Sequence, residues 1–190
     1  MSGFPPLYVL RHGETEWNAA GRLQGRFDSP LTETGRGQAK MQHGILARQN
    51  LNQFAAISSP QGRAFATAQI AVGPLVPEVM TDAALSEIGL GDWAGKYRDE
   101  VIVQSGARDG FDLYELAPEG EGFAALHHRC ELFLRNLRGP SVLITHGITS
   151  RMLRLVATGR RQGALREMGG GQGVVFHIVE GTQERLTLGG

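Results

Sequence analysis

The sequence has almost no cysteine and no long apolar run. Its single cysteine, Cys130, excludes an internal disulfide framework and a cysteine-rich zinc site, and it fits a reducing cytoplasm. No 18 apolar residues run together, and the first residues lack the basic region and the long apolar segment of an export signal. We therefore expect a cytoplasmic protein that does not bind membranes.

The chain also lacks a net charge. Its 19 basic residues balance 19 acidic ones, so no overall field directs it to nucleic acid or to a membrane surface. Lysine is scarce, and 17 of the basic residues are arginine. This bias reflects either genome composition or a need for the side chain that binds phosphate or carboxylate in a bidentate manner. At 190 residues, we expect a single domain over residues 1–190.

Strand-like runs alternate with helical patterns along the chain, which predicts an α/β layered fold. We expect strands at 7–10, 55–58, 77–80, 141–145, 174–179 and 184–188. We expect helices at 32–48, 59–72, 118–137 and 148–158. In residues 82–122 the apolar residues do not recur at a regular spacing, which indicates loop and short helix.

Two of the predicted strands end in a histidine followed by a glycine. The first ends in Arg11, His12 and Gly13, and a later one ends in His146 and Gly147. Ligands of parallel sheets bind in the crevice beyond the carboxyl ends of the strands. We expect Gly13 to leave the imidazole of His12 open, because glycine has no side chain and allows backbone angles that other residues resist.

Histidine and arginine gathered at strand ends suit a phosphate group. A phosphoryl group in transfer carries negative charge, and its transfer depends mostly on positioning and electrostatic stabilisation. Arg11, Arg63 and His146 can supply the donors without a metal ion. A neutral imidazole at His12 can attack phosphorus in line and form a phosphohistidine, after which the leaving alcohol needs a proton donor. The residues predict a phosphoryl-transfer site with no metal and no cofactor.

Four segments carry a resemblance that runs through nearly the whole chain. They are Arg11-His12-Gly13-Glu14-Thr15 with Asn18 and Gln24, Ser58-Ser59-Pro60 with Arg63, Leu85-Ser86-Glu87 with Trp93-Ala94-Gly95, and His146-Gly147. These segments resemble the motifs of the histidine phosphatase superfamily, also called the phosphoglycerate mutase-like family. The resemblance implies a three-layer α/β/α sandwich with a mostly parallel central sheet. The chain departs from the family pattern at Ala94, where glutamate is usual, and at Gly122, where serine is usual.

The resemblance also implies roles for individual residues. It implies that His12 is phosphorylated and that Glu87 shuttles the proton, with Arg11, Arg63 and His146 completing the catalytic set. The residues expected to hold the phosphate are Arg11, Asn18, Gln24, Arg63, His146 and Gly147. The implied partner is a small phosphorylated metabolite, and no oligomeric state follows from the sequence.

Three functional classes fit this family. In a phosphomonoesterase, water resolves the phosphohistidine; in a phosphoglycerate-type mutase, bound product takes the phosphoryl group back; a regulatory member has no activity. The full set of catalytic residues argues against the third class. Family members that resemble mutases carry a longer insertion after the catalytic glutamate, and this region is short here. The sequence therefore favours the phosphatase.

The charge of the segment after Glu87 points the same way. Residues 94–122 contain three basic and seven acidic side chains. If this segment lines the mouth of the pocket, its negative charge repels a bisphosphorylated cofactor and any substrate with a further anionic group. We therefore expect monoesters of neutral alcohols to be preferred.

Overall fold

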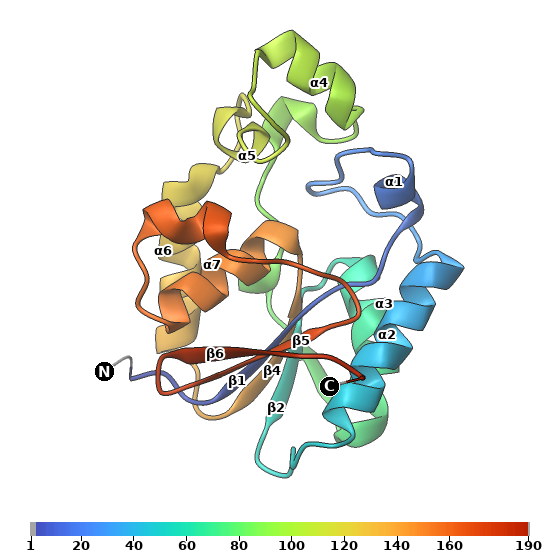
Figure 1. Cartoon of the computed structure of the whole chain (residues 1–190), viewed down its shortest axis with the longest axis vertical. Helices are drawn as coiled ribbons and strands as arrows, with labels where there is room; N and C mark the ends of the chain where they lie inside the picture. Colours follow the sequence, from blue (N-terminus) through green and yellow to red (C-terminus); the bar gives the residue numbers. More distant parts are fainter. Residues whose placement is uncertain (1–2, 190) are drawn as a thin grey trace.

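A computed structural model describes residues 3–189 of the chain. Met1, Ser2 and Gly190 lie outside the described residues. Met1 and Ser2 begin the segment that we expect to carry no export signal. The described part folds as a six-stranded sheet with helices on both of its faces (Figure 1). Within residues 3–189, every helix is too short or too polar to span a membrane.

The sheet is mixed and mostly parallel, which confirms the predicted fold class. Its strands are β1 (Leu7–Arg11), β2 (Ala55–Ser58), β3 (Val79–Thr81), β4 (Ser141–Thr145), β5 (Val175–Val179) and β6 (Thr182–Leu186). They lie in the order β3-β2-β4-β1-β5-β6. The pairs β3–β2, β2–β4 and β4–β1 are parallel, whereas β5 is antiparallel to both of its neighbours, β1 and β6. Arg11 at the end of β1 lies opposite Thr145 at the end of β4. The two histidine-bearing strand ends are therefore neighbours.

Helices cover both faces of the sheet (Figure 1). On one face lie α2 (Glu33–Leu46) and α3 (Gly62–Ala71), and on the other lie α6 (Gly122–Arg135) and α7 (Gly147–Ala157). Alternate side chains of β1 enter the two cores, because successive residues of a strand point to opposite faces. Tyr8 and Leu10 pack with α2 and α3, whereas Leu7 and Val9 pack with α6 and α7.

A smaller group of elements lies beyond the carboxyl ends of the parallel strands, at the top of Figure 1. It includes α1 (Glu16–Ala19), α4 (Arg98–Ser105) and α5 (Leu113–Leu116). Short 3-10 helices at Gly73–Leu75, Ala83–Leu85, Gly91–Trp93 and Gln162–Glu167 complete the chain. A small core of Leu23, Leu90, Val101 and Leu113 holds this group together. The expectation of loop and short helix for residues 82–122 is confirmed.

The start of α3 differs from the prediction in a way that matters for the site. The prediction of a helix from Ser59 is wrong by three residues, because the helix begins at Gly62 with Gln61 as its N-cap. Asp28, from a distant loop, accepts the backbone N–H of Arg63 through its carboxylate. Negative charge is favourable at a helix N-terminus. Arg63 therefore lies in the first turn of α3, next to the end of β2.

Two strand boundaries also differ from the prediction. The strand expected at 77–80 is observed at 79–81, and the one expected at 184–188 is observed at 182–186. The second difference has a local cause, since Glu180 and Gly181 both adopt positive φ values and form a tight turn between β5 and β6. The last strand therefore begins directly after this turn.

Candidate active site

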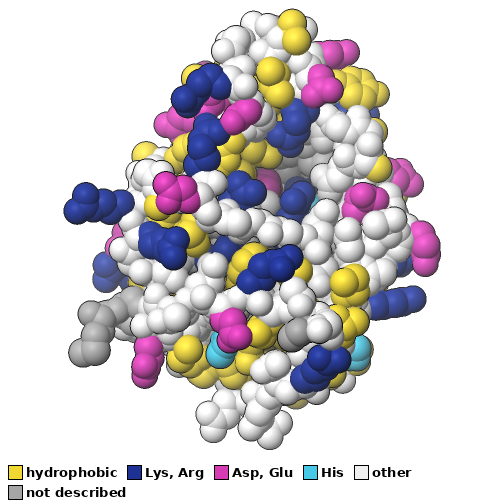
Figure 2. Space-filling model, in the orientation of Figure 1, with side chains coloured by type: hydrophobic (Ala, Val, Ile, Leu, Met, Phe, Trp, Pro, Cys, Tyr) yellow, Lys and Arg dark blue, Asp and Glu magenta, His cyan; other side chains and the backbone are white. Residues whose placement is uncertain are grey.

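A cavity of about 370 Å³ lies where the ends of β1 and β4 meet the group of elements around α4 and α5. Figure 2 shows it as a hollow with basic side chains around it. Seven of the eight predicted site residues line it: Arg11, His12, Asn18, Gln24, Arg63, Glu87 and Gly147. The eighth, His146, is fully buried beside the cavity, with its ring centre 5.1 Å from that of His12.

His12 is buried at the end of β1 with one ring nitrogen engaged. Its Nδ1 lies 2.7 Å from the backbone carbonyl oxygen of Gly13. A carbonyl can only accept, so Nδ1 carries the ring proton and Nε2 keeps its lone pair. Burial and the nearby charges of Arg11 and Arg63 lower the pKa of His12 well below its usual value. The ring is therefore neutral, and Nε2 holds its free lone pair.

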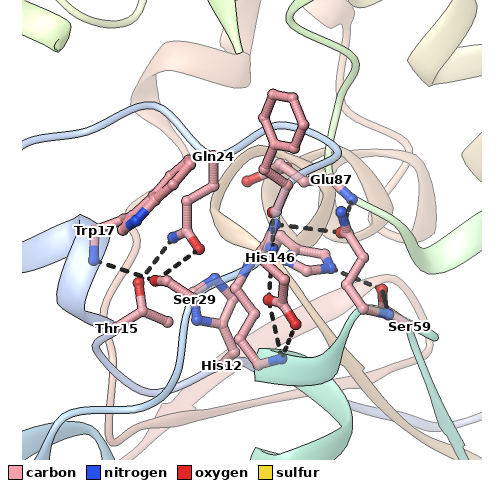
Figure 3. Close-up of polar contacts among 12 residues, drawn as sticks. His12, Thr15, Trp17, Gln24, Ser29, Ser59, Glu87 and His146 are labelled. Atoms are coloured by element: carbon pink, nitrogen blue, oxygen red, sulfur yellow. Dashed lines mark hydrogen bonds and ion pairs between the residues drawn. The ribbon is translucent and has the colours of Figure 1, made fainter. Parts of the chain in front are cut away.

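His146 is oriented by Ser59. Its Nε2 lies 2.8 Å from the hydroxyl oxygen of Ser59 (Figure 3). That oxygen also accepts the backbone N–H of Gln61 at 3.3 Å, so the hydroxyl proton is available for Nε2. When the hydroxyl donates in this way, the ring proton of His146 lies on Nδ1; this atom is buried and has no hydrogen-bond partner among the described residues. In that tautomer, His146 offers a free N–H donor beside His12.

Both buried histidines should remain neutral at mildly acidic pH. Burial, followed by the charges of neighbouring arginines, lowers the pKa of His12 and of His146 well below 6.5, because both causes oppose the charged form. The hydrogen bond to Gly13 raises the pKa of His12 but is the smallest of the causes. In a nitrogen-15 NMR titration, neither ring should take up a second proton as the pH falls through 6.5. The variants His12→Asn and His146→Asn assign the signals. A ring that protonates near pH 6.5 would contradict the buried, neutral pair.

Two arginines next to His12 have unsatisfied donors. The guanidinium of Arg63 is held by the carbonyl oxygens of Phe27 at 2.7 Å and Gly25 at 3.2 Å, and by Asp28 at 3.0 Å. Its Nε, like the Nε of Arg11, is buried and has no partner among the described residues. Buried N–H groups without a partner are rare and costly. Their presence on both arginines indicates a place for an anion.

The carboxylate of Glu87 is fixed at the N-terminus of α7. Its Oε1 accepts the backbone N–H of Thr149 at 3.1 Å, and its Oε2 accepts the N–H of Ile148 at 3.3 Å. The hydroxyl of Thr149 lies 3.1 Å from Oε1 and donates to the carbonyl oxygen of Ser86 at 2.8 Å. Gln61 connects this segment to α3, since its Oε1 accepts the backbone N–H of Glu87 at 3.0 Å and a guanidinium N–H of Arg63 at 3.3 Å. Glu87 is therefore positioned relative to Arg63.

The two glycines that follow the histidines differ in what a side chain at each position would meet. A Cβ at Gly147 would lie 3.5 Å from both Arg11 Cζ and Glu87 Oε2, so glycine leaves room for a ligand between these groups. The expected role of Gly13 needs correction, because Gly13 does not adopt a positive φ. A Cβ there would overlap the carbonyl oxygen of Gly35 in α2. Gly13 is required because two backbones pack closely, rather than to expose His12.

Asn18 and Gln24 are connected through Thr15. The Thr15 hydroxyl oxygen accepts the backbone N–H of Asn18 at 3.2 Å and the amide Nε2 of Gln24 at 2.8 Å, and Ser29 donates to Gln24 Oε1 at 3.4 Å (Figure 3). Asn18 Oδ1 accepts the backbone N–H of Thr15 at 3.3 Å. The amide nitrogen of Asn18 and the second N–H of Gln24 therefore remain for a ligand.

The predicted acidic rim is wrong. Of the seven carboxylates in residues 94–122, only Asp109 lines the cavity, and it is paired with Arg166. Asp112 and Glu121 are in ion pairs, and Asp99, Glu100, Glu115 and Glu119 are exposed. The cavity is instead lined by Arg11, Arg22, Arg63, Arg98 and Arg151. A charge count along the chain does not show which side chains face the cavity, and no motif marks Arg98 or Arg151.

The fold and the cavity define an α/β protein in which histidine and arginine side chains meet at the ends of adjacent parallel strands. Residues 7–188 match the histidine phosphatase superfamily (branch 1), and the chain belongs to this family. This confirms the family that the motifs predicted.

Comparison with known proteins finds a relative by sequence and solved structures with a similar fold. The chain is 34% identical over 179 residues to the probable phosphoglycerate mutase GpmB of Serratia proteamaculans, covering 84% of this chain and 80% of that protein. Its fold is similar to mycobacterial glucosyl-3-phosphoglycerate phosphatase Rv2419c in complex with VO3, with 25% identity, a TM-score of 0.81 and coverage of 96% of this chain and 98% of that one. For Bacillus stearothermophilus YhfR, the identity is 32%, the TM-score 0.76 and the coverage 96% and 95%.

Proposed function

We propose that the protein is a phosphomonoesterase that hydrolyses a small phosphorylated metabolite through a phosphohistidine at Nε2 of His12. The observation that carries this proposal is the neutral imidazole of His12, with Nδ1 bound to Gly13 and Nε2 free, between Arg11 and Arg63. The donors proposed for the phosphoryl oxygens are Arg11, Asn18, Gln24, Arg63, His146 and the backbone at Gly147. Glu87 is the proposed proton donor and acceptor.

In the first step, the lone pair of His12 Nε2 attacks phosphorus and the bond from phosphorus to the alcohol oxygen breaks. The alcohol oxygen takes a proton from Glu87, which thereby becomes a carboxylate. Oε2 accepts one backbone N–H in the structure, whereas Oε1 accepts two, so Oε2 has room for the transferred proton. The unpartnered N–H groups of Arg11, Arg63 and His146 stabilise the charge on the phosphoryl oxygens.

In the second step, water attacks phosphorus on the phosphohistidine. The carboxylate of Glu87 takes a proton from this water, the bond from phosphorus to Nε2 breaks, and inorganic phosphate leaves. His12 returns to its neutral form with the proton still on Nδ1, where Gly13 accepts it.

A phosphoglycerate mutase-type transfer is the second candidate. It is favoured by the similarity to the probable phosphoglycerate mutase GpmB of Serratia proteamaculans. The arginines of the cavity also favour it, because they suit a phosphorylated product that stays bound. Hydrolysis is favoured by the phosphatase among the structural relatives and by the short region between Glu87 and α6, which contains the small helices α4 and α5 and one 3-10 helix.

A product assay separates these candidates. With 3-phosphoglycerate as substrate, with and without 2,3-bisphosphoglycerate, release of inorganic phosphate should outrun formation of 2-phosphoglycerate. Interconversion that is faster than phosphate release would make the protein a mutase. Absence of both reactions, and of p-nitrophenyl phosphate hydrolysis, would make it a non-catalytic member of the family.

Turnover should not depend on a metal ion. The positive charge around His12 comes from guanidinium groups, which can replace a cation in neutralising phosphoryl oxygens. Exhaustive dialysis against a chelator should leave kcat for p-nitrophenyl phosphate unchanged. Loss of activity that returns when magnesium or zinc is added would contradict this prediction.

A further inference from the structure

The cavity is larger than a phosphoryl group requires. Its volume of about 370 Å³ lies within the range of roughly 300–1,000 Å³ that is usual for small-molecule sites. Beyond the groups assigned to the phosphate, its wall includes Arg22, Arg98, Tyr114 and Arg151. The basic side chains around the hollow in Figure 2 belong to this part of the molecule. The space beyond the residues assigned to the phosphate is therefore lined in part by cationic groups.

Arg98 is held in place by neutral groups. Its guanidinium donates to the carbonyl oxygen of Gly110 at 3.1 Å and to the hydroxyl oxygen of Tyr114 at 3.3 Å. Because this hydroxyl accepts from Arg98, its own proton is free for a ligand. Neither contact neutralises the positive charge of Arg98.

Arg151 approaches the same segment from α7. Its guanidinium carbon lies 6.0 Å from the ring centre of Phe111. Phe111 directly follows Gly110, whose carbonyl oxygen accepts the hydrogen bond from Arg98. Its Nε is buried without a hydrogen-bond partner. Among residues 3–189, neither Arg98 nor Arg151 forms an ion pair, although Arg108 and Arg166 nearby do so.

The charges of Arg98 and Arg151 act on the floor of the cavity. Burial is the main cause that lowers the pKa of Arg11; Glu87 and Tyr114 raise it, and the charges of Arg151 and Arg98 lower it further. Like charges held this close repel one another unless an anion lies between them. One phosphoryl group is already served by Arg11, Arg63 and His146, so it leaves Arg98 and Arg151 uncompensated.

We propose that Arg98 and Arg151, with the hydroxyl of Tyr114, form a second anion subsite, and that the substrate is a phosphate monoester whose alcohol part carries a carboxylate or a second phosphate. This inference rests on the proposed function and reverses the preference for neutral alcohols that the sequence suggested. Arg98 and Arg151 determine specificity, whereas Arg11 and Arg63 serve the phosphoryl group that is transferred.

Two matched substrate pairs test the subsite. The first pair is 3-phosphoglycerate and glycerol 3-phosphate, which differ by a carboxylate, and the second is fructose 1,6-bisphosphate and fructose 6-phosphate, which differ by a phosphate. In Arg98→Gln and Arg151→Gln, kcat/KM for the anionic member should fall roughly 10- to 100-fold, the range for one charge-assisted hydrogen bond. For glycerol 3-phosphate and fructose 6-phosphate, whose alcohol parts are neutral, kcat/KM should change little. Arg161→Gln, which removes the same charge from an exposed position, is the control.

The outcomes separate the subsite from the proposed function. A loss confined to one pair identifies the anion as carboxylate or phosphate, and either result supports the subsite. Equal losses on both members of a pair, or no loss on either anionic member, overturns it. Hydrolysis of p-nitrophenyl phosphate and its inhibition by inorganic vanadate should persist in both variants, which shows that the floor of the cavity is intact. If the wild-type protein hydrolyses no monoester, the proposed function itself fails.

Discussion

His12→Asn should reduce kcat for phosphate monoesters on the order of 10⁴- to 10⁶-fold, the loss expected when a catalytic nucleophile is removed. The asparagine amide can still donate to the carbonyl oxygen of Gly13, as Nδ1 of His12 does at 2.7 Å, so the turn should keep its shape. No atom then replaces Nε2. Steady-state hydrolysis of p-nitrophenyl phosphate measures the effect, and KM should change far less than kcat because Arg11 and Arg63 remain.

A matched control separates this effect from the mere loss of a histidine. His128 is exposed on α6, and His128→Asn should leave kcat unchanged. Folding of both variants is compared by thermal unfolding. A loss of less than about tenfold in well-folded His12→Asn would be too small for a lost nucleophile, and another residue would have to attack phosphorus.

The second large effect is expected at Glu87. General acid–base catalysis contributes roughly 10²- to 10⁴-fold, and Glu87→Gln should slow hydrolysis of the alkyl ester glycerol 3-phosphate by about this factor. The glutamine oxygen can occupy the position of Oε1, where Thr149 and the N–H of Ile88 donate to it. The amide nitrogen then lies where Oε2 was and has no acidic proton to give.

The leaving group decides whether Glu87 acts as the acid. p-Nitrophenol leaves without a proton, so p-nitrophenyl phosphate should lose much less activity than glycerol 3-phosphate in Glu87→Gln. Glu100→Gln, at an exposed position of α4, is the control and should affect neither ester. Equal losses on both esters would assign the proton to another group. Asp109 would be the first to test, because it is the other carboxylate that lines the cavity.

The sequence predicts the central part of the fold and the floor of the cavity because both depend on local patterns. The apolar runs of β1 and β4 are buried on both faces, and each ends in a histidine and a glycine that the parallel register places side by side. Family motifs then supply Arg63 and Glu87. Such signals lie within a few residues of one another and can be seen without a structure.

The wall of the cavity depends on contacts between distant segments, which no local pattern shows. Arg98 and Arg151 are 53 positions apart in the sequence. They meet at residues 110–111 only because α4, α5 and α7 pack around one cavity. The carboxylates of residues 94–122, which give this segment its negative charge, face solvent or pair with arginines outside the cavity. The hydrogen bond from Ser59 to His146 likewise joins strand ends that are 87 residues apart.

The central claim is that Nε2 of His12 carries the phosphoryl group during turnover. Rapid acid-free quenching with a phosphorus-32-labelled monoester, followed by peptide mapping, tests it most directly. The label should lie on the peptide that contains His12, should survive alkali and be lost in acid, and should be absent from His12→Asn. Label on a serine or on His146, or turnover at the normal rate with no labelled intermediate, would contradict the account.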